Sequence, residues 1–197
     1  QIMINGDMPF PMASTAKIAV AATYLAGVEQ GRLRLDQPFP MMVPVAESAD
    51  SRGPVAAVRP GEVMTAQSLM ELSITRSDNH ATDGLIAAVG GIGSVNTWLS
   101  RIGVTGQRLD HTMATLVRDD GRVNPVTTID TRTSSTPRAM ATLLAAIDRA
   151  ARWLPAVHPP DPRSPHASLA TACMLPPASP SPHKPGASTW FRWQSGG

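Results

Sequence analysis

The sequence predicts an α+β fold in which a helix-rich middle is flanked by a few short strands. Apolar residues recur at helical spacing in several windows between residues 14 and 154. The segments between these windows are polar or marked by proline and glycine. Strand patterns occur only near the two ends and are too few to close a sheet. We therefore expect a helical domain beside an incomplete antiparallel sheet domain.

Length and composition narrow the class of protein. A chain of 197 residues can form one domain with a hydrophobic core. The 17 basic and 15 acidic side chains are interspersed, without the basic stripe of a nucleic-acid surface. No run of about 18 apolar residues is present, so we expect no membrane span. We expect a monomer that acts on a small molecule.

Metal and disulfide chemistry is not indicated. The single cysteine, Cys173, excludes an internal disulfide and a cysteine-based zinc site. His111, His158 and His166 lack the spacing of metal ligands. We therefore predict no metal site and no cofactor.

The first half of the chain opens on residues 1–6, which read as the end of a strand before a turn at 5–7. A chain that opens within a strand indicates missing N-terminal structure. Residues 14–30 are rich in alanine with apolar residues at helical spacing, and Gly31 is a typical helix end. Residues 36–61 are polar and contain several prolines, which predicts a loop or a short strand.

The middle of the chain is predicted to be mainly helical. Thr65 is suited to cap a helix over 66–75, and further helices are expected over 80–89 and 93–102. Residues 107–134 are polar and irregular, and loops of such length are usually functional or disordered.

A last helix is predicted from Thr136 and Pro137, which are suited to its cap and first position. The composition changes after residue 154, because ten of the 19 prolines follow it and apolar periodicity stops. We therefore predict a core unit over 1–154 that lacks an N-terminal strand or helix. A divergent Pro-rich segment over 155–197 is expected to be extended or disordered.

The first motif with chemical content is Ser14-Thr15-Ala16-Lys17. A serine hydroxyl needs a neighbouring base to become a good nucleophile. Residues three apart at a helix start share one face, so Lys17 Nζ can reach Ser14 Oγ. The helix N-terminus also offers N–H groups that can stabilise an oxyanion. An isolated S-x-x-K match is common, but here an alanine-rich apolar helix follows it, as expected for a buried nucleophile helix.

The second motif is Ser77-Asp78-Asn79, about 60 residues later. Ser77 can relay a proton to a leaving nitrogen, and Asn79 can hydrogen-bond both a substrate amide and the lysine. Asp78 is expected to be a structural hydrogen-bond acceptor. Taken alone, Ser-Asp-Asn is also common in turns that connect helices.

Together, S-x-x-K followed by S-D-N is a specific signature of class A β-lactamases and penicillin-binding proteins. The segments FPMASTAKIAVAATYL and ITRSDNHATDGLIAAVGG resemble the two matching segments of the class A β-lactamase superfamily. STPRAMATLL resembles the helix after that family's omega loop, and the likeness covers roughly residues 1–150. It implies a β-lactamase/transpeptidase-like fold, with the active site between a helical and an α/β domain.

The family's third motif, lysine-threonine-glycine on a strand, has an altered counterpart at Lys184-Pro185-Gly186. The resemblance implies that Lys184 binds the substrate carboxylate and that Gly186 lines the site. It also implies that the N–H of Ala187 is a second oxyanion donor. Pro185 replaces the threonine and removes one N–H. A charged residue in a disordered tail remains an alternative for Lys184.

The omega-loop stretch departs most from the family. Class A enzymes carry a glutamate that activates water for deacylation, and Met113 stands at that position. The nearest acidic residues, Asp119 and Asp120, are expected in a solvated turn. Without a placed base, the acyl-enzyme should hydrolyse slowly, which favours a penicillin-binding or D,D-peptidase-like member over an efficient β-lactamase.

The resulting prediction is a serine hydrolase acylated at Ser14 by β-lactams or D-Ala-D-Ala-like amides, with Lys17 and Ser77 as proton carriers and Asn79 positioning the substrate. The family implies a periplasmic or secreted location and a link to antibiotic resistance. Two alternatives remain. The chain could be a catalytically dead remnant, or it could be a structural partner domain with a large exposed apolar patch.

Overall fold

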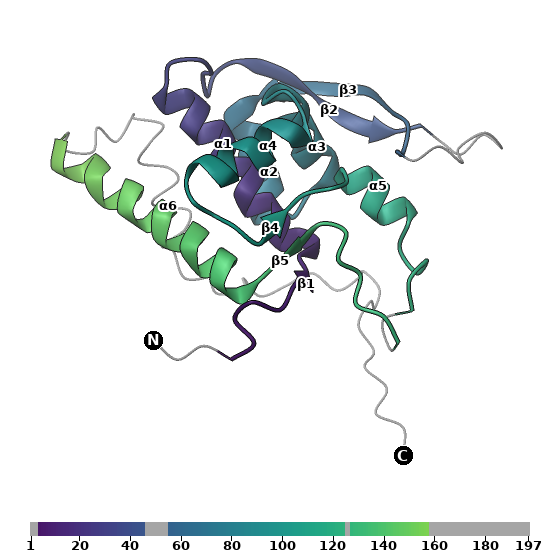
Figure 1. Cartoon of the computed structure of the whole chain (residues 1–197). Coiled ribbons are helices and arrows are strands. Elements are labelled where there is room, and N and C mark those ends of the chain that lie inside the picture. The colour runs from purple at the N-terminus through teal and green to yellow at the C-terminus, as the bar shows by residue number, and fades with distance from the viewer. Residues whose placement is uncertain (1–3, 46–54, 125–126, 158–197) are drawn as a thin grey trace, which may run out of the picture.

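A computed structural model describes residues 4–45, 55–124 and 127–157 (Figure 1). The predicted Pro-rich segment beyond residue 157, with Lys184, Gly186 and Ala187, lies outside the described residues. Within them, helices are combined with two small antiparallel sheets, so the α+β fold class is confirmed. No helix in these ranges has the length and apolar content needed to cross a membrane.

The central element is the helix α1, Ala16–Glu29, preceded by one 3₁₀ turn, Ala13–Thr15. Figure 1 shows it running through the middle of the helical layer. The alanine-rich sequence suits this place, because small side chains let neighbouring helices approach on several sides. Gly31, at φ 69°, follows the helix in the left-handed conformation that glycine adopts without steric cost.

Three helices surround α1, and each begins within one residue of its predicted start. They are α2, Ala66–Thr75; α3, Asn79–Ala88; and α4, Ile92–Arg101. Thr65 caps α2 as expected, since its Oγ1 accepts a hydrogen bond from the Ser68 N–H at 3.2 Å. The caps and the helical periodicity therefore determine this part of the fold.

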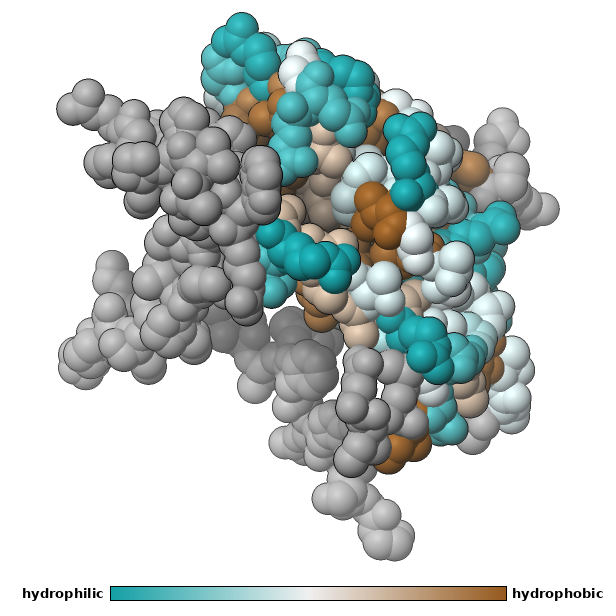
Figure 2. Space-filling model, turned by 60° about the vertical axis from the view of Figure 1, so that its left-hand side comes forward, coloured by the Kyte–Doolittle hydropathy of each residue, from teal (hydrophilic) through white to brown (hydrophobic). Residues whose placement is uncertain are grey.

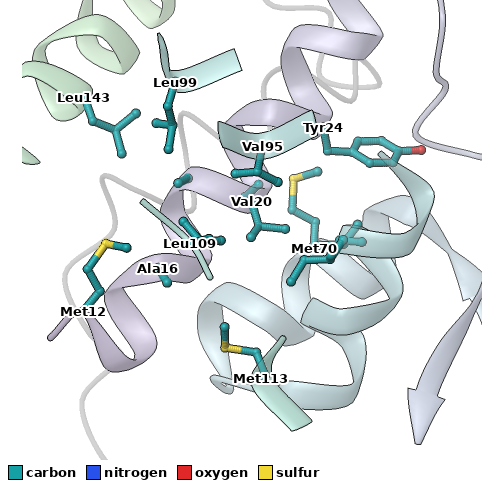
Figure 3. Packing of buried hydrophobic residues seen from close by; sticks show 14 of the residues in the cluster. Met12, Ala16, Val20, Tyr24, Met70, Val95, Leu99, Leu109, Met113 and Leu143 are labelled. Carbon is teal, nitrogen blue, oxygen red and sulfur yellow. The ribbon is translucent and has the colours of Figure 1, made fainter. Parts of the chain in front are cut away.

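One hydrophobic core joins these helices (Figure 3). Val20 and Tyr24 on α1, Leu69 on α2 and Leu99 on α4 are fully buried. A buried leucine of this kind typically contributes about 2–5 kcal/mol to stability relative to alanine. The core lies directly behind the turn that carries Ser14.

A β-hairpin lies along one side of the helices (Figure 1). Strands β2, Pro38–Pro44, and β3, Val58–Thr65, pair antiparallel, and β3 extends past residue 61, the end of the region expected to be a loop or a short strand. Helix α3 packs closely on β2 at Gly84, where a Cβ would lie 2.6 Å from the carbonyl oxygen of Pro40. This close contact requires glycine at position 84.

A second sheet has three strands of two residues each, in the order β1-β5-β4. They are β1, Phe10–Pro11; β4, Gln107–Arg108; and β5, Ser134–Ser135. Strands β4 and β5 lie at the two ends of the segment 107–134, which was predicted to be irregular. The short helix α5, Met113–Arg118, lies between them. At the N-terminus, residues 4–7 form bends and a turn, as predicted for residues 5–7, whereas residues 1–3 of the predicted strand end lie outside the described residues.

The last described helix, α6, spans Pro137–Val157. Thr136 caps it, because its Oγ1 accepts a hydrogen bond from the Ala139 N–H at 3.1 Å. The helix continues three residues past the predicted end at 154, through Pro155. Leu143 of α6 is fully buried, whereas the adjacent Leu144 is 47% exposed.

Candidate active site

Ser14 is placed by the junction between β1 and α1. The N–H of Met12 donates to the carbonyl of Thr133 at 3.1 Å, which ties this junction to the end of the 107–134 segment. Ala13 has a φ of 44°, an uncommon conformation for a residue with a Cβ, which typically costs about 1–3 kcal/mol. Ser14 follows it in the exposed 3₁₀ turn, so its hydroxyl is accessible from solvent.

Lys17 lies in the first turn of α1 and is only 3% exposed. Its Nζ donates to Ser77 Oγ at 2.9 Å, to Asn79 Oδ1 at 2.7 Å and to the carbonyl oxygen of Ser77. An ammonium group has three N–H donors, so these acceptors engage all of them. The structure therefore brings the predicted lysine together with both predicted residues of the second motif.

Ser77 connects Lys17 to the nucleophile position. Its Oγ lies 3.0 Å from Ser14 Oγ, and the same atom accepts from Lys17 Nζ. The sequence predicted a direct contact between Lys17 and Ser14, but the observed hydrogen bonds run through Ser77, because Ser77 and Asn79 draw the ammonium toward the start of α3. Ser77 itself has an uncommon positive φ of 54°. Ser14 follows Ala13, whose φ is also positive.

Asp78 and Asn79 begin α3. Asp78 Oδ1 accepts from the Ala81 N–H at 2.8 Å and caps the helix, which is the structural role expected for it. This cap fixes the orientation of the first turn, where Asn79 holds Lys17. His80, the next residue, is partly buried.

Two opposing effects act on the Lys17 ammonium. Burial lowers the pKa of Lys17 below its ordinary value, while the charges of Asp78 and Asp83 raise it. Burial is the largest of these causes, so the net pKa is lowered. The amine is therefore easier to deprotonate than an exposed lysine.

Met113, which we expected at the glutamate position from the sequence resemblance, begins α5 and is 3% exposed within the core (Figure 3). Its backbone N–H donates to Asp83 Oδ1 at 2.7 Å, and the Ala114 N–H donates to Asp83 Oδ2 at 2.8 Å. No carboxylate of the described residues contacts the Ser14 hydroxyl. Sequence reasoning missed Asp83, although an acidic residue inside the apolar run ATDGLIAA is a signal for it.

Asp119 differs from its expected place in a solvated turn. It is only 8% exposed and forms ion pairs with three arginines: Arg118 at 2.9 Å, Arg122 at 3.2 Å and Arg132 at 3.6 Å. The arginines enclose it because the loop folds back on itself and brings Arg132 to the end of α5. Asp120 is exposed, as predicted.

Comparisons with known proteins identify the family of the chain. A sequence profile described as "Beta-lactamase enzyme family" matches residues 1–153. The chain belongs to this family. It is 34% identical over 155 residues to β-lactamase Toho-2 of Escherichia coli and 34% identical over 143 residues to β-lactamase L2 of Stenotrophomonas maltophilia.

Solved β-lactamase structures also resemble the chain. An ancestral class A β-lactamase superposes with a TM-score of 0.54 at 34% identity, covering 74% of this chain and 52% of that one. The chromosome-encoded β-lactamase of Vibrio parahaemolyticus gives 0.55 at 26% identity, covering 73% and 51%. The predicted likeness to class A β-lactamases is therefore confirmed.

The matched part is limited on both sides. It covers 78% of this chain and 49% of Toho-2, and 72% of this chain and 43% of L2. The chain therefore spans about half the length of the curated relatives it matches.

Among the residues that the structure describes, no group of three or more His, Cys, Asp or Glu side chains is placed to hold a metal ion.

Proposed function

We propose that this chain is acylated at Ser14 by a β-lactam or by a D-Ala-D-Ala-like amide. The observation that carries the proposal is the hydrogen-bonded series from Ser14 Oγ through Ser77 Oγ to the buried Lys17 Nζ. A serine nucleophile hydrogen-bonded to a group that leads to a desolvated amine has a base within reach, and such a base activates serine for acyl transfer.

In the proposed reaction, neutral Lys17 accepts the proton of Ser77 Oγ while Ser77 accepts the proton of Ser14. The bond between Ser14 Oγ and the carbonyl carbon forms, and the C–N bond then breaks. Lys17 returns the proton through Ser77 to the departing nitrogen, so the proton balance closes. Asn79 Oδ1 holds Lys17, which leaves the side-chain NH₂ of Asn79 to donate to the substrate amide.

The remaining substrate contacts are proposed from the resemblance alone. Lys184 supplies a cation for the substrate carboxylate. The N–H of Ala187, beside Gly186, joins an N–H of the first turn of α1 as the oxyanion donors. The substrates of the family imply a periplasmic or secreted location, and we propose that the protein acts as a monomer.

Deacylation is proposed to be slow. Met113 has no group that activates water, and its side chain lies in the core. Asp83, whose carboxylate reaches the Met113 backbone, uses both oxygens for backbone N–H groups. A long-lived acyl-enzyme is therefore expected, as in a penicillin-binding protein.

Intact-mass spectrometry after incubation with a penicillin tests the proposal. The wild type should gain the mass of one penicillin, and Ser14→Ala should gain none. Ser100→Ala, which removes an exposed hydroxyl on α4, is the matched control and should be labelled like the wild type. An adduct on Ser14→Ala would contradict the proposal. No adduct and no loss of penicillin would favour the catalytically dead remnant.

The alternative of a structural partner domain rests on a large apolar patch. Figure 2 shows one face of the molecule, where hydrophobic residues of the described ranges form small groups separated by hydrophilic ones. This face offers no continuous apolar surface among those residues, so it gives the alternative no support.

A further inference from the structure

The segment that leads into the nucleophile turn is weakly packed. Residues 6–12, which we call the strap, run past the first turn of α6 and through β1 toward Ser14 (Figure 1). Met12 is the only buried residue of the strap, whereas the side chains of Met8 and Phe10 are exposed. Apolar contacts therefore anchor the end of the strap beside Ser14, and its beginning must be held by polar groups.

Arg138, in the first turn of α6, holds the beginning of the strap. Its backbone N–H donates to the carbonyl of Gly6 at 3.0 Å. Its guanidinium donates to both carboxylate oxygens of Asp7, from Nε at 2.7 Å and from Nη2 at 3.1 Å. Paired hydrogen bonds of this kind fix the relative orientation of the two side chains, which a single contact does not. Backbone and side chain of Arg138 thus attach two adjacent residues of the strap to α6.

The rest of the strap has few groups that can donate hydrogen bonds. Pro9 and Pro11 have no backbone N–H, so they cannot donate to a neighbouring strand. Strand β1 pairs with β5 over two residues, and the Met12 N–H then donates to the carbonyl of Thr133 at 3.1 Å. These partners and Arg138 all lie within residues 133–138, so one short stretch of the fold holds the strap along its length.

The geometry of the nucleophile depends on this attachment. Ala13 has a φ of 44°, and a residue with a Cβ keeps such a conformation only where its surroundings impose it. Helix α1 holds the turn on one side, and the strap holds it on the other. If the strap loosens, Ala13 can relax, and the 3.0 Å contact between Ser14 Oγ and Ser77 Oγ is disturbed.

We propose that Asp7 and Arg138 form a positioning clamp for Ser14. The pair lies at the far end of the strap from the nucleophile. It keeps the strap, and through it Ala13, in the conformation that places Ser14 Oγ beside Ser77 Oγ. The catalytic meaning of this inference rests on the proposed function. The attachment of the strap can be measured without any acylation.

The clamp should affect the acylation rate more than the stability of the fold. The side chains of Asp7 and Arg138 are 76% and 58% exposed, and exposed ion pairs contribute little to global stability. A nucleophile, by contrast, is sensitive to small displacements, since a shift of about 1 Å can cost about 100-fold in rate. We expect loss of the clamp to slow acylation by a smaller factor, about tenfold, because Met12 and the Arg138 N–H still hold the strap.

Charge reversal tests the clamp. Asp7→Arg and Arg138→Asp each replace the attraction by repulsion between like charges, and the double variant restores an ion pair of opposite polarity. Time-resolved intact-mass spectrometry at several penicillin concentrations gives the acylation rate constant at saturation and the half-saturating concentration. Asp36→Arg makes the same change in the exposed pair with Arg34, which lies beyond the opposite end of α1 from Ser14, and is the matched control.

Both single variants should lower the rate constant at saturation about tenfold, while the half-saturating concentration and the melting temperature stay close to those of the wild type. The double variant should recover most of the rate constant, and Asp36→Arg should match the wild type. Single variants that are acylated at the wild-type rate would overturn the proposal, and so would a double variant as slow as the single ones.

Hydrogen exchange gives a readout that needs no substrate. The Met12 amide should exchange faster in each single variant than in the wild type and regain its protection in the double variant. The amide of Val89, which donates to the Leu85 carbonyl at the end of α3, is the internal reference and should not change. Equal protection of Met12 in the wild type and all three variants would overturn the clamp, whether or not Ser14 is acylated. The expected exchange pattern without any penicillin adduct would support the clamp and contradict only the proposed function.

Discussion

The hydroxyl of Ser77 lies 3.0 Å from the hydroxyl of Ser14. The Ser77 hydroxyl also accepts a hydrogen bond from Lys17, so it connects the exposed Ser14 to a lysine that is almost completely buried. The hydrogen bonds of Lys17 Nζ go to Ser77 and Asn79 and not to Ser14. In the proposed reaction, protons move along these hydrogen bonds while the amine stays in place, as expected for a preorganised site.

Replacing Ser77 with alanine should therefore slow acylation while the protein stays folded. The relay between Ser14 and Lys17 would be interrupted, and general acid–base groups of this kind typically contribute about 10²- to 10⁴-fold. Time-resolved mass spectrometry of the penicillin adduct measures the rate. Acylation of Ser77→Ala at the wild-type rate would show that protons do not pass through this hydroxyl.

The acylation rate should rise with pH and level off below the ordinary pKa of lysine. Burial lowers the pKa of Lys17, so the neutral amine becomes populated at lower pH than in an exposed lysine. Lys17→Ala should remove this dependence and slow labelling strongly. Unchanged labelling of a folded Lys17→Ala protein would contradict the role of Lys17 as base.

Local signals in the sequence predicted most of the helical layer. Thr65 and Thr136 cap the helices they were expected to cap, since a cap depends on neighbours within three residues. The hairpin was recognised only as a loop or a short strand. Pro38, Pro40 and Pro44 lie within β2, and prolines lower the strand signal even where the strand forms.

The long-range contacts of the site could not be predicted in this way. Asp83 and Met113 are 30 residues apart, and no local pattern states that one accepts from the other. Asp119 was expected to be solvated because it lies in the turn at 119–121, yet the fold brings Arg132, which is distant in the sequence, to 3.6 Å from its carboxylate. Short-range motifs thus indicated which residues meet at Ser14, but not which charges surround them.

Asp119→Asn should destabilise the protein at neutral pH. The hydrogen bond from Arg118 is the main cause that lowers the pKa of Asp119, with the charges of Arg118, Arg122 and Arg132 adding to it. A carboxyl with a lowered pKa stabilises the folded state above its unfolded pKa and loses this contribution as the pH falls through the folded pKa. We expect a loss of about 1–3 kcal/mol near neutral pH.

Thermal unfolding at neutral pH and at an acidic pH below the lowered pKa of Asp119 checks this expectation. The wild type and Asp119→Asn should differ at neutral pH and converge in acid. Asp120→Asn, the exposed neighbour, should match the wild type at both values. Equal melting temperatures of wild type and Asp119→Asn at neutral pH would mean that the arginine cluster does not stabilise the loop.

The docking of α6 on the core can be tested with two adjacent leucines. Leu143 is fully buried in the core, and Leu144 is 47% exposed. Leu143→Ala should lower the free energy of unfolding by about 2–5 kcal/mol, whereas Leu144→Ala should stay within about 0.5 kcal/mol of the wild type. Urea denaturation of the three proteins measures both values. If both substitutions had equally small effects, or if no cooperative transition appeared, α6 would not be part of one folded core, and the reading of the chain as a dead remnant would gain support.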